Sequence, residues 1–246
     1  MNKKYAVFID GDNISSDYLD VIMTEIIKDN DEILIKRIYG DWTTPNMNSW
    51  KDKISNFPIR VFQQFRNGPN ATDNSIIMDA IELAIQNKEI NAFCIVSTDV
   101  DYYSLALRLR ENGKYVLGIG KEISNAIWQN ACNEFVTIEN IVKPKSALDE
   151  TAVTNNKEND LMAIFEYSLA NSRILADGWI SLGNYASTIN SKYPSFDPRT
   201  YGSTKLLSLI KKFDNIIEIK TDNHFPPRYF LRKIEKNKQS KSKETT

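Results

Sequence analysis

Four aspartates stand at positions where a folded chain could gather them into one metal site. Asp10 directly follows the first apolar run of the chain, and Asp99 and Asp101 follow a later one. Asp73 stands where a helical pattern begins. Carboxylates in contact repel each other by about 4 kcal/mol per pair at low effective dielectric, so such a cluster needs a cation. Ligation by oxygen alone suits Mg²⁺ or Mn²⁺ rather than zinc.

A helix cap is the alternative explanation for each of these acids taken alone. Asp73 or its neighbour Thr72 could cap the helix that follows, and Asp99 or Asp101 could cap the helix that starts beside them. Three acid-bearing segments that converge on one edge of a sheet favour a shared site over separate caps. Weaker candidates for the same site are Asp12, Asp41 and Asp79.

Other catalytic chemistries lack the residues they need. The chain has one histidine, His224, and two separated cysteines, Cys94 and Cys132, which we expect to be reduced packing residues. These three cannot form a zinc site or a Ser-His or Cys-His nucleophile pair. The glycine patterns of P-loop and Rossmann nucleotide sites are also absent. Any catalysis must therefore use carboxylates.

The composition of the 246 residues is that of a soluble globular protein, with 41% hydrophobic and 26% charged residues. No stretch approaches the roughly 18 apolar residues of a membrane span, and the apolar run near the N-terminus is too short for a signal peptide. We therefore expect a cytoplasmic protein with no membrane partner. Residues 1–157 hold 17 basic and 22 acidic side chains, whereas residues 158–246 hold 14 and 10. This asymmetry suggests a carboxylate site joined to an anion-binding module.

Short apolar runs alternate with helical patterns in the first half of the chain, which is typical of a parallel sheet covered by helices on both faces. We therefore predict a three-layer α/β domain. Ligands of such sheets bind at the carboxyl ends of the strands, where the strand order reverses. The first and fourth strands are commonly neighbours there, so Asp10 and Asp99 should lie side by side. The expected strands are Tyr5–Ile9, Ile33–Tyr39, Ile59–Phe65, Ala92–Val96, Tyr115–Ile119 and a short sixth at Phe135–Ile138.

A second, smaller domain is predicted after a break in hydrophobic periodicity. We expect three helices near residues 161–170, 182–193 and 199–213, then a hairpin at residues 216–233. Three helices and a hairpin are the elements of a winged helix. The predicted organisation is a first domain at 1–142, a linker at 143–159, a winged-helix domain at 160–233 and a disordered basic tail at 234–246.

The first domain resembles the NYN family, a branch of the PIN-like nucleases that includes LabA-like proteins. Phe8–Asn13 reads F-I-D-G-D-N and looks like the opening D-G-x-N motif of that family. Asn70–Asp73 resembles the segment that carries its second acid, and Val96–Tyr103 resembles its S-x-D-x-D-F motif. Tyr102 stands where Phe is usual, a difference that we expect to be without effect. The resemblance covers residues 3–140.

This resemblance implies a metal-dependent ribonuclease that acts on single-stranded RNA. Asn13 would orient Asp10 or a water molecule, and Ser97 and Thr98 could donate hydrogen bonds to a phosphate oxygen. One ion and two ions are both compatible with the ligands. The resemblance implies that Mg²⁺ or Mn²⁺ is bound by Asp10, Asp73, Asp99 and, as a fourth acid, Asp101.

The second domain resembles the LOTUS domain, also called OST-HTH, which often accompanies NYN domains. The similar segments are Asp177–Leu182, Tyr193–Gly202 and the helix Lys205–Lys212, and the resemblance covers residues 160–232. It implies RNA binding or, in some members, a protein partner. We expect the aromatic residues Trp179, Phe196 and Tyr201 to pack in the core. Candidate phosphate contacts, unless they only form a solvated face, are Lys205, Lys211, Lys212 and Arg228.

Two alternatives to a nuclease remain open. Asp10 and Asp12 at a strand end superficially resemble the acids of haloacid-dehalogenase phosphatases, but Asn13 and Ile14 follow where that family has a threonine. The domain could instead bind RNA or a protein without catalysis and keep its acids for folding or metal binding. Because all four acids are present, we predict a metal-dependent endoribonuclease with an RNA-binding or partner-binding C-terminal domain.

Overall fold

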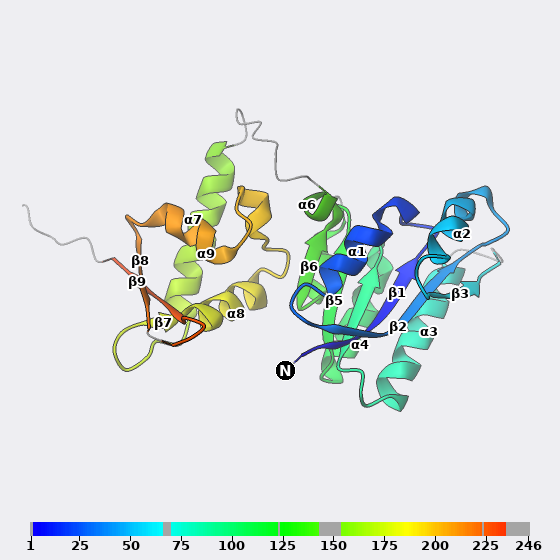
Figure 1. Ribbon diagram of the computed structural model, residues 1–246, viewed down its shortest axis with the longest axis horizontal. Coiled ribbons are helices and arrows are strands. Elements are labelled where there is room, and N and C mark those ends of the chain that lie inside the picture. Colours follow the sequence, from blue (N-terminus) through cyan, green and yellow to red (C-terminus); the bar gives the residue numbers. More distant parts are fainter. Residues whose placement is uncertain (1, 66–69, 123, 143–153, 223, 235–246) are drawn as a thin grey trace, which may run out of the picture. The chain divides into compact units, whose positions relative to one another are not determined.

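The computed structural model describes residues 2–65, 70–122, 124–142, 154–222 and 224–234. The chain divides into two compact units, of which the first holds every element from β1 to α6 and the second every element from α7 to β9. Figure 1 shows the elements of both units. Most of the predicted linker 143–159 and nearly all of the predicted tail 234–246 lie outside the described residues.

A six-stranded sheet forms the centre of the first unit. Its strands lie in the order β3-β2-β1-β4-β5-β6, and all neighbouring pairs are parallel. The chain order reverses between β1 and β4, which pair directly, as the sequence predicted. The strands are β1 (Lys4–Asp10), β2 (Glu32–Gly40), β3 (Arg60–Gln63), β4 (Ala92–Val96), β5 (Tyr115–Gly120) and β6 (Glu134–Thr137).

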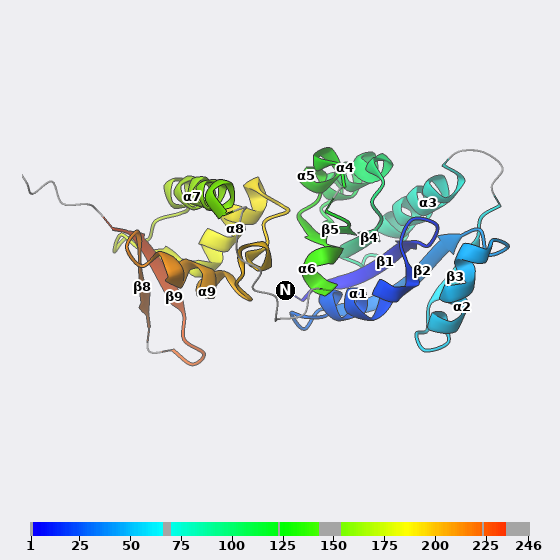
Figure 2. The same ribbon diagram turned by 90° about the horizontal axis from the view of Figure 1, so that it is seen from above.

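Helices cover both faces of this sheet, so the first unit has three layers, as Figure 2 shows. Side chains of α1, α2 and α6 pack against one face, and side chains of α3, α4 and α5 pack against the other. The arrangement confirms the predicted α/β class and explains why β1 is buried from Tyr5 to Asp10. The helices are α1 (Leu19–Ile26), α2 (Asn48–Ile54), α3 (Ala71–Gln86), α4 (Tyr103–Glu111), α5 (Ala126–Ala131) and α6 (Ile138–Val142).

Short 3₁₀ turns lead into three of these helices. They are η1 (Ser16–Tyr18) before α1, η2 (Pro45–Met47) before α2 and η3 (Val100–Tyr102) before α4. The last of these turns matters for the site, because it begins directly after Asp99 and carries Asp101 and Tyr102.

Two further expectations concern packing and membranes. Cys94 and Cys132 are buried free thiols, which confirms their predicted role in packing. Among the residues that the structure describes, none of the helices combines the length and apolar character that a membrane span needs.

The second unit combines helices with an antiparallel sheet of order β7-β9-β8. The hairpin expected near the end of the chain is confirmed as β8 and β9, and β7 adds a third strand beside β9. Trp179 is buried, as expected of a core residue, whereas Phe196 and Tyr201 are half-buried. The elements are α7 (Thr154–Asn171), β7 (Ile180–Ser181), α8 (Leu182–Lys192), η4 (Pro198–Tyr201), α9 (Leu206–Ile210), η5 (Lys211–Phe213), β8 (Ile217–Thr221) and β9 (Tyr229–Lys233).

Two helices of this unit differ from their predicted extents. The helix expected near residues 199–213 is divided into η4, α9 and η5. It breaks because Gly202 has a left-handed backbone with φ of 67° and Lys205 is extended, and neither conformation continues a helix. The first helix, α7, begins at Thr154 rather than near residue 161, so its first turns lie within the predicted linker.

Candidate metal centre at the switch point of the sheet

Asp10 ends β1 at the point where the strand order reverses, and only 3% of its surface is exposed. Its Oδ2 accepts a hydrogen bond from the Ser97 hydroxyl at 3.1 Å, and the Tyr102 hydroxyl oxygen lies 3.4 Å from the same atom. Its Oδ1 is also buried, and no donor among the described residues reaches it. A buried carboxylate oxygen without a partner is costly, so this atom points to a missing ligand.

Asp73 lies in the first turn of α3 and is buried. Its Oδ1 accepts a hydrogen bond from the Tyr102 hydroxyl at 2.8 Å. The N-cap of α3 is Asn70, which has a left-handed backbone and whose side-chain amide donates to Asp101 Oδ2 at 2.7 Å. The suggestion that Thr72 or Asp73 caps this helix is therefore wrong, because the cap lies earlier in the chain.

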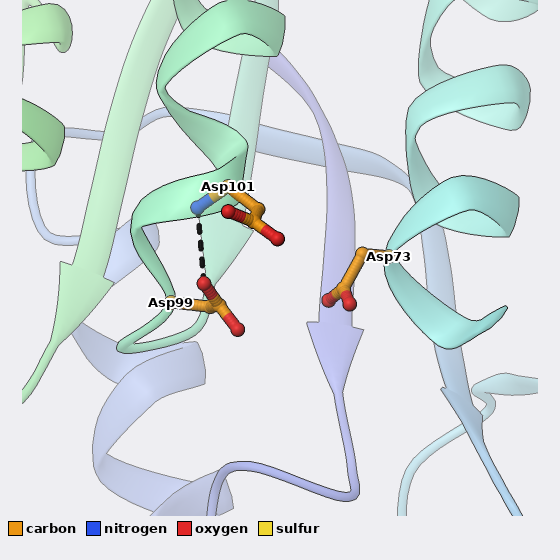
Figure 3. Close-up of side chains that lie close together, drawn as sticks. All are labelled: Asp73, Asp99 and Asp101. Atoms are coloured by element: carbon orange, nitrogen blue, oxygen red, sulfur yellow. Dashed lines mark hydrogen bonds between the residues drawn. The ribbon is translucent and has the colours of Figure 1, made fainter. Parts of the chain in front are cut away.

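Asp99 and Asp101 lie on the turn that follows β4. The Asp99 carboxylate accepts a hydrogen bond from the backbone N–H of Asp101 at 3.0 Å, so its predicted capping role is confirmed. One carboxylate oxygen from each of Asp73, Asp99 and Asp101 lies within 4.8 Å of the other two. Figure 3 shows these three side chains pointing toward one another, Asp73 from α3 and the other two from the turn. We call these three residues the acid cluster; Asp10 is linked to it through the Tyr102 hydroxyl.

Burial and like charge make the buried acids harder to ionise. Desolvation by burial and then the nearby Asp73 charge raise the pKa of Asp10 to about 7, although the hydrogen bond from Ser97 opposes the rise. Burial also raises the pKa of Asp73, which the Tyr102 hydroxyl opposes and the charges of Asp99 and Asp101 reinforce. Burial, followed by the charges of Asp10 and Asp73, raises the pKa of Tyr102, so its hydroxyl remains a hydrogen-bond donor at neutral pH.

A hard divalent cation fits this set of donors. All the acidic ligand atoms are oxygens, which suits Mg²⁺ or Mn²⁺. None of the salt bridges formed among the described residues involves Asp10 or a member of the acid cluster. Side-chain cations therefore do not offset the repulsion among these acids in the part of the chain that is described. The partnerless Oδ1 of Asp10 is a second sign of a missing cation.

Asn13, Ser97 and Thr98 tie the loop after β1 to the loop after β4. The side-chain oxygen of Asn13 accepts hydrogen bonds from the backbone N–H of Thr98, at 3.2 Å, and from the Thr98 hydroxyl. Ser97 is fully buried, and its hydroxyl donates to Asp10 while it accepts from the Asp99 N–H at 3.1 Å. Both hydroxyls considered for phosphate binding thus donate to acceptors inside the protein. The Asn13 side chain bonds to Thr98 rather than to Asp10.

The weaker acid candidates bind protein groups around the site. The two oxygens of Asp12 accept from the Asp41 N–H at 3.2 Å and from the Thr72 hydroxyl at 3.0 Å. Asp79 forms a salt bridge with Arg37 at 2.7 Å. Asp12 joins the loop after β2 to the start of α3, and Asp79 joins the middle of α3 to β2. Neither is a member of the acid cluster.

Two residues that shape the site were not among the predicted site residues. Tyr102 reaches both Asp10 and Asp73, and Asn70 reaches Asp101. The only sequence signal for either residue is its place in the chain, because Tyr102 directly follows Asp101 and Asn70 begins the segment that ends in Asp73.

The basic residues proposed for RNA contact are all exposed in the second unit, but their partners differ. Arg228 forms a salt bridge with Asp222 at 2.6 Å. The Lys212 ammonium donates to the Gly202 carbonyl at 3.1 Å. The side chains of Lys205 and Lys211 make no hydrogen bond or salt bridge within the described parts of the chain.

Two family models match the chain. The NYN domain model matches residues 4–139, and the OST-HTH/LOTUS domain model matches residues 168–229. No curated protein matches. One similar solved structure is a protein of unknown function from Vibrio parahaemolyticus, with 19% identity over 56% of this chain and 93% of that chain and a TM-score of 0.46. NYN domains belong to a nuclease superfamily and LOTUS domains are typically RNA-binding, so the two matches support an RNA-related role.

Proposed function

The chain belongs to the NYN domain family, and from this membership we propose that it is a metal-dependent endoribonuclease acting on single-stranded RNA. The observation that carries the proposal is the acid cluster together with the buried, partnerless Oδ1 of Asp10. Both lie at the switch point of a parallel sheet, where such folds bind their ligands. Because the site holds carboxylates and no histidine or thiol, the chemistry it supports is metal-assisted hydrolysis of a phosphodiester.

The residues that would hold Mg²⁺ or Mn²⁺ are Asp10, Asp73, Asp99 and Asp101. Such an ion activates water as the nucleophile and offsets charge on the scissile phosphate. Asp99 is held in place by the backbone N–H of Asp101, since it caps the turn that also carries Asp101. Asp101 is fixed in turn by the Asn70 amide.

Hydroxyl groups hold the buried part of the site. Ser97 fixes the Oδ2 of Asp10 and receives the Asp99 N–H, so one side chain aligns acids from two neighbouring strands. The hydrogen bonds from Thr98 to Asn13 connect the loop after β4 to the loop after β1. In this proposal Asn13, Ser97 and Thr98 act by positioning the acids, and any direct contact with phosphate requires their hydrogen bonds to rearrange.

The C-terminal domain would bring RNA, or a protein partner, to the nuclease domain. We take residues 160–233 as this domain. Exposed cations bind nucleic acid through its phosphates, which is a salt-dependent and sequence-independent contribution. The proposed contacts are Lys205, Lys211, Lys212 and Arg228. Lys205 and Lys211 could bind a phosphate without first breaking a hydrogen bond or salt bridge to the described residues.

A cleavage assay tests the proposal. Full-length protein is incubated with single-stranded RNA and Mn²⁺ or Mg²⁺, and wild type is compared with Asp10→Asn and Asp99→Asn. Asp52→Asn removes an exposed charge from α2 and serves as the matched control. We expect cleavage by wild type and the control, loss in both site variants and loss with a chelator. Equal cleavage by all four proteins would show that another site or a contaminant is responsible.

The second candidate is a protein that binds RNA without cutting it. The observation that favours it is that two of the acids already have structural partners, because Asp99 caps the turn η3 and Asp73 accepts a hydrogen bond from Tyr102. RNA retention by wild type with no cleavage in Mn²⁺ or Mg²⁺ would favour this candidate over the nuclease. Release of phosphate from small phosphoesters, with RNA left intact, would instead indicate a phosphatase.

A further inference from the structure

One tyrosine hydroxyl touches both buried acids of the site. Tyr102 is fully buried, and its hydroxyl lies 2.8 Å from Asp73 Oδ1 and 3.4 Å from Asp10 Oδ2. The two acids come from different elements, Asp10 from the end of β1 and Asp73 from the first turn of α3. Tyr102 comes from a third, the turn η3. A single hydroxyl therefore joins three segments that are far apart in the sequence.

The tyrosine is itself held in place by the helix packed behind it. Its ring packs against the indole of Trp128 on α5, with the ring centroids 6.1 Å apart. The same indole donates a hydrogen bond to the backbone carbonyl of Ser97 at 3.2 Å. Ser97 supplies the other hydroxyl that reaches Asp10. One buried tryptophan thus supports both residues whose hydroxyls lie next to Asp10.

The hydrogen bonds divide the oxygens of Asp10 into two roles. The Ser97 and Tyr102 hydroxyls both approach Oδ2, whereas Oδ1 receives no donor among the described residues. Outer hydrogen bonds of this kind fix the orientation of a ligating carboxylate and leave its other oxygen for the metal. Without the hydroxyl, Asp10 and Asp73 would keep their mutual repulsion and lose the group that lies between them.

We propose that Tyr102 is a positioning residue that holds Asp10 and Asp73 in the arrangement to which a divalent cation binds. The proposal rests on the metal site of the proposed function but not on RNA cleavage. It predicts that the hydroxyl contributes to metal affinity, whereas a tyrosine that merely satisfies a buried polar group would contribute to stability alone.

Tyr115 offers a matched control. Its hydroxyl donates a hydrogen bond to the Glu134 carboxylate at 2.7 Å, so Tyr115, like Tyr102, is bonded to an acid. It stands at the beginning of β5, at the opposite end of the strands from the acid cluster. Tyr115→Phe and Tyr102→Phe therefore remove the same kind of hydrogen bond from the two ends of one sheet.

The test measures Mn²⁺ binding by calorimetry on the full-length variants, without RNA. We expect Tyr102→Phe to weaken Mn²⁺ binding by about 10-fold or more, the effect typical of losing a group that orients a metal ligand, and Tyr115→Phe to leave it unchanged. In cleavage assays Tyr102→Phe should lose turnover at low Mn²⁺ and regain it at saturating Mn²⁺, with KM for RNA unchanged.

The outcomes separate this proposal from the nuclease proposal. Folded Tyr102→Phe that binds Mn²⁺ as tightly as wild type would overturn the positioning role. A Tyr102→Phe variant that failed to fold even with Mn²⁺ would overturn it too, because the role given to the hydroxyl is to arrange the acids and not to build the core. Wild type that binds Mn²⁺ but cuts no RNA would refute only the nuclease, and wild type that binds no Mn²⁺ would refute both.

Discussion

The acids of the candidate site in the first unit and the basic residues of the sheet in the second unit differ in their partners. In the first, Asp10 and the acid cluster gather with hydroxyl and amide donors, and none of the salt bridges among the described residues involves them. In the second, most basic side chains near the sheet have an acid beside them. The pairs are Lys220 with Asp177, Arg228 with Asp222, Arg232 with Glu218 and Lys233 with Glu166.

This difference indicates which charges are available for function. Exposed ion pairs of the second unit contribute little to stability and need no outside partner. A group of carboxylates without a cation is unfavourable by itself, and a fold that keeps it gains from an ion that binds there. By the same reasoning Lys205 and Lys211, which form no salt bridge among the described residues, are better candidates for RNA contact than the paired cations.

The largest effect is expected where an acid of the cluster is neutralised. Asp73→Asn should reduce metal-dependent RNA cleavage by about 10³-fold or more, since several kcal/mol of charge stabilisation at the phosphate would be lost. Single-turnover rates on labelled RNA measure this loss. Asp79→Asn is an informative comparison, because Asp79 is already paired with Arg37 and should affect stability more than the rate per folded molecule. Equal rate losses in the two variants would remove the distinction between clustered and paired acids.

The next effect concerns the stability that a metal confers. An ion that binds only the folded protein stabilises it by about 2.7 kcal/mol at 100 times its dissociation constant. We therefore expect Mn²⁺ to raise the melting temperature of wild type and to leave that of Asp73→Asn nearly unchanged. Differential scanning fluorimetry with and without Mn²⁺ measures the shift. The same shift in both proteins would mean that the stabilising ion binds elsewhere.

A smaller effect is expected from pH in the absence of metal. Asp10 has a pKa of about 7 in the folded protein against an ordinary value of 3.8 for an aspartate in water, so the folded state binds more protons between these values. Stability should therefore fall as pH rises from about 4 to about 7, by an amount on the order of 4 kcal/mol, and this contribution should level off above pH 7. Urea unfolding of metal-free protein across this range measures the trend.

Asp10→Asn is the variant that isolates this effect. It carries no ionisable group at this position, so the fall attributed to Asp10 should disappear, and the metal-free variant should be more stable than wild type at pH 7.5. The same pH dependence in wild type and variant would assign the trend to other groups. A more stable but inactive variant would show that the charge at this position serves function at the expense of the fold.

The sequence was sufficient to predict that β1 and β4 are neighbours, because this follows from the alternation of strands and helices. It did not predict that Asp10 lies outside the acid cluster. Parallel strands present their carboxyl ends at one edge, and adjacency of β1 and β4 brings Asp10 and the Asp99 turn together. The position of Asp73 followed from the helix in whose first turn it lies. These are properties of backbone topology, which apolar runs and helical patterns reveal.

The hydrogen bonds within the site could not be predicted in this way. Tyr102 was expected to be equivalent to a phenylalanine, since nothing in its spacing shows that η3 turns its hydroxyl toward Asp73. Ser97 and Thr98 were assigned to phosphate, and only the folded turn shows their hydroxyls donating to Asp10 and Asn13. The divided third helix of the second unit had a visible signal in Gly202, whose left-handed backbone ends η4.

The smallest predicted effect concerns Lys205 and Lys211, which form no salt bridge among the described residues. Replacing both Lys205 and Lys211 by Gln should weaken binding to single-stranded RNA severalfold. It should also reduce the slope of log affinity against log salt by about 1.4, since each phosphate contact on a single strand contributes about 0.7. Arg228→Gln should change the slope less, because Arg228 must first leave Asp222. Fluorescence anisotropy in chelator, which prevents cleavage, gives both quantities. A larger slope change from Arg228→Gln than from the double variant would mean that pairing does not decide which cations of this domain reach RNA.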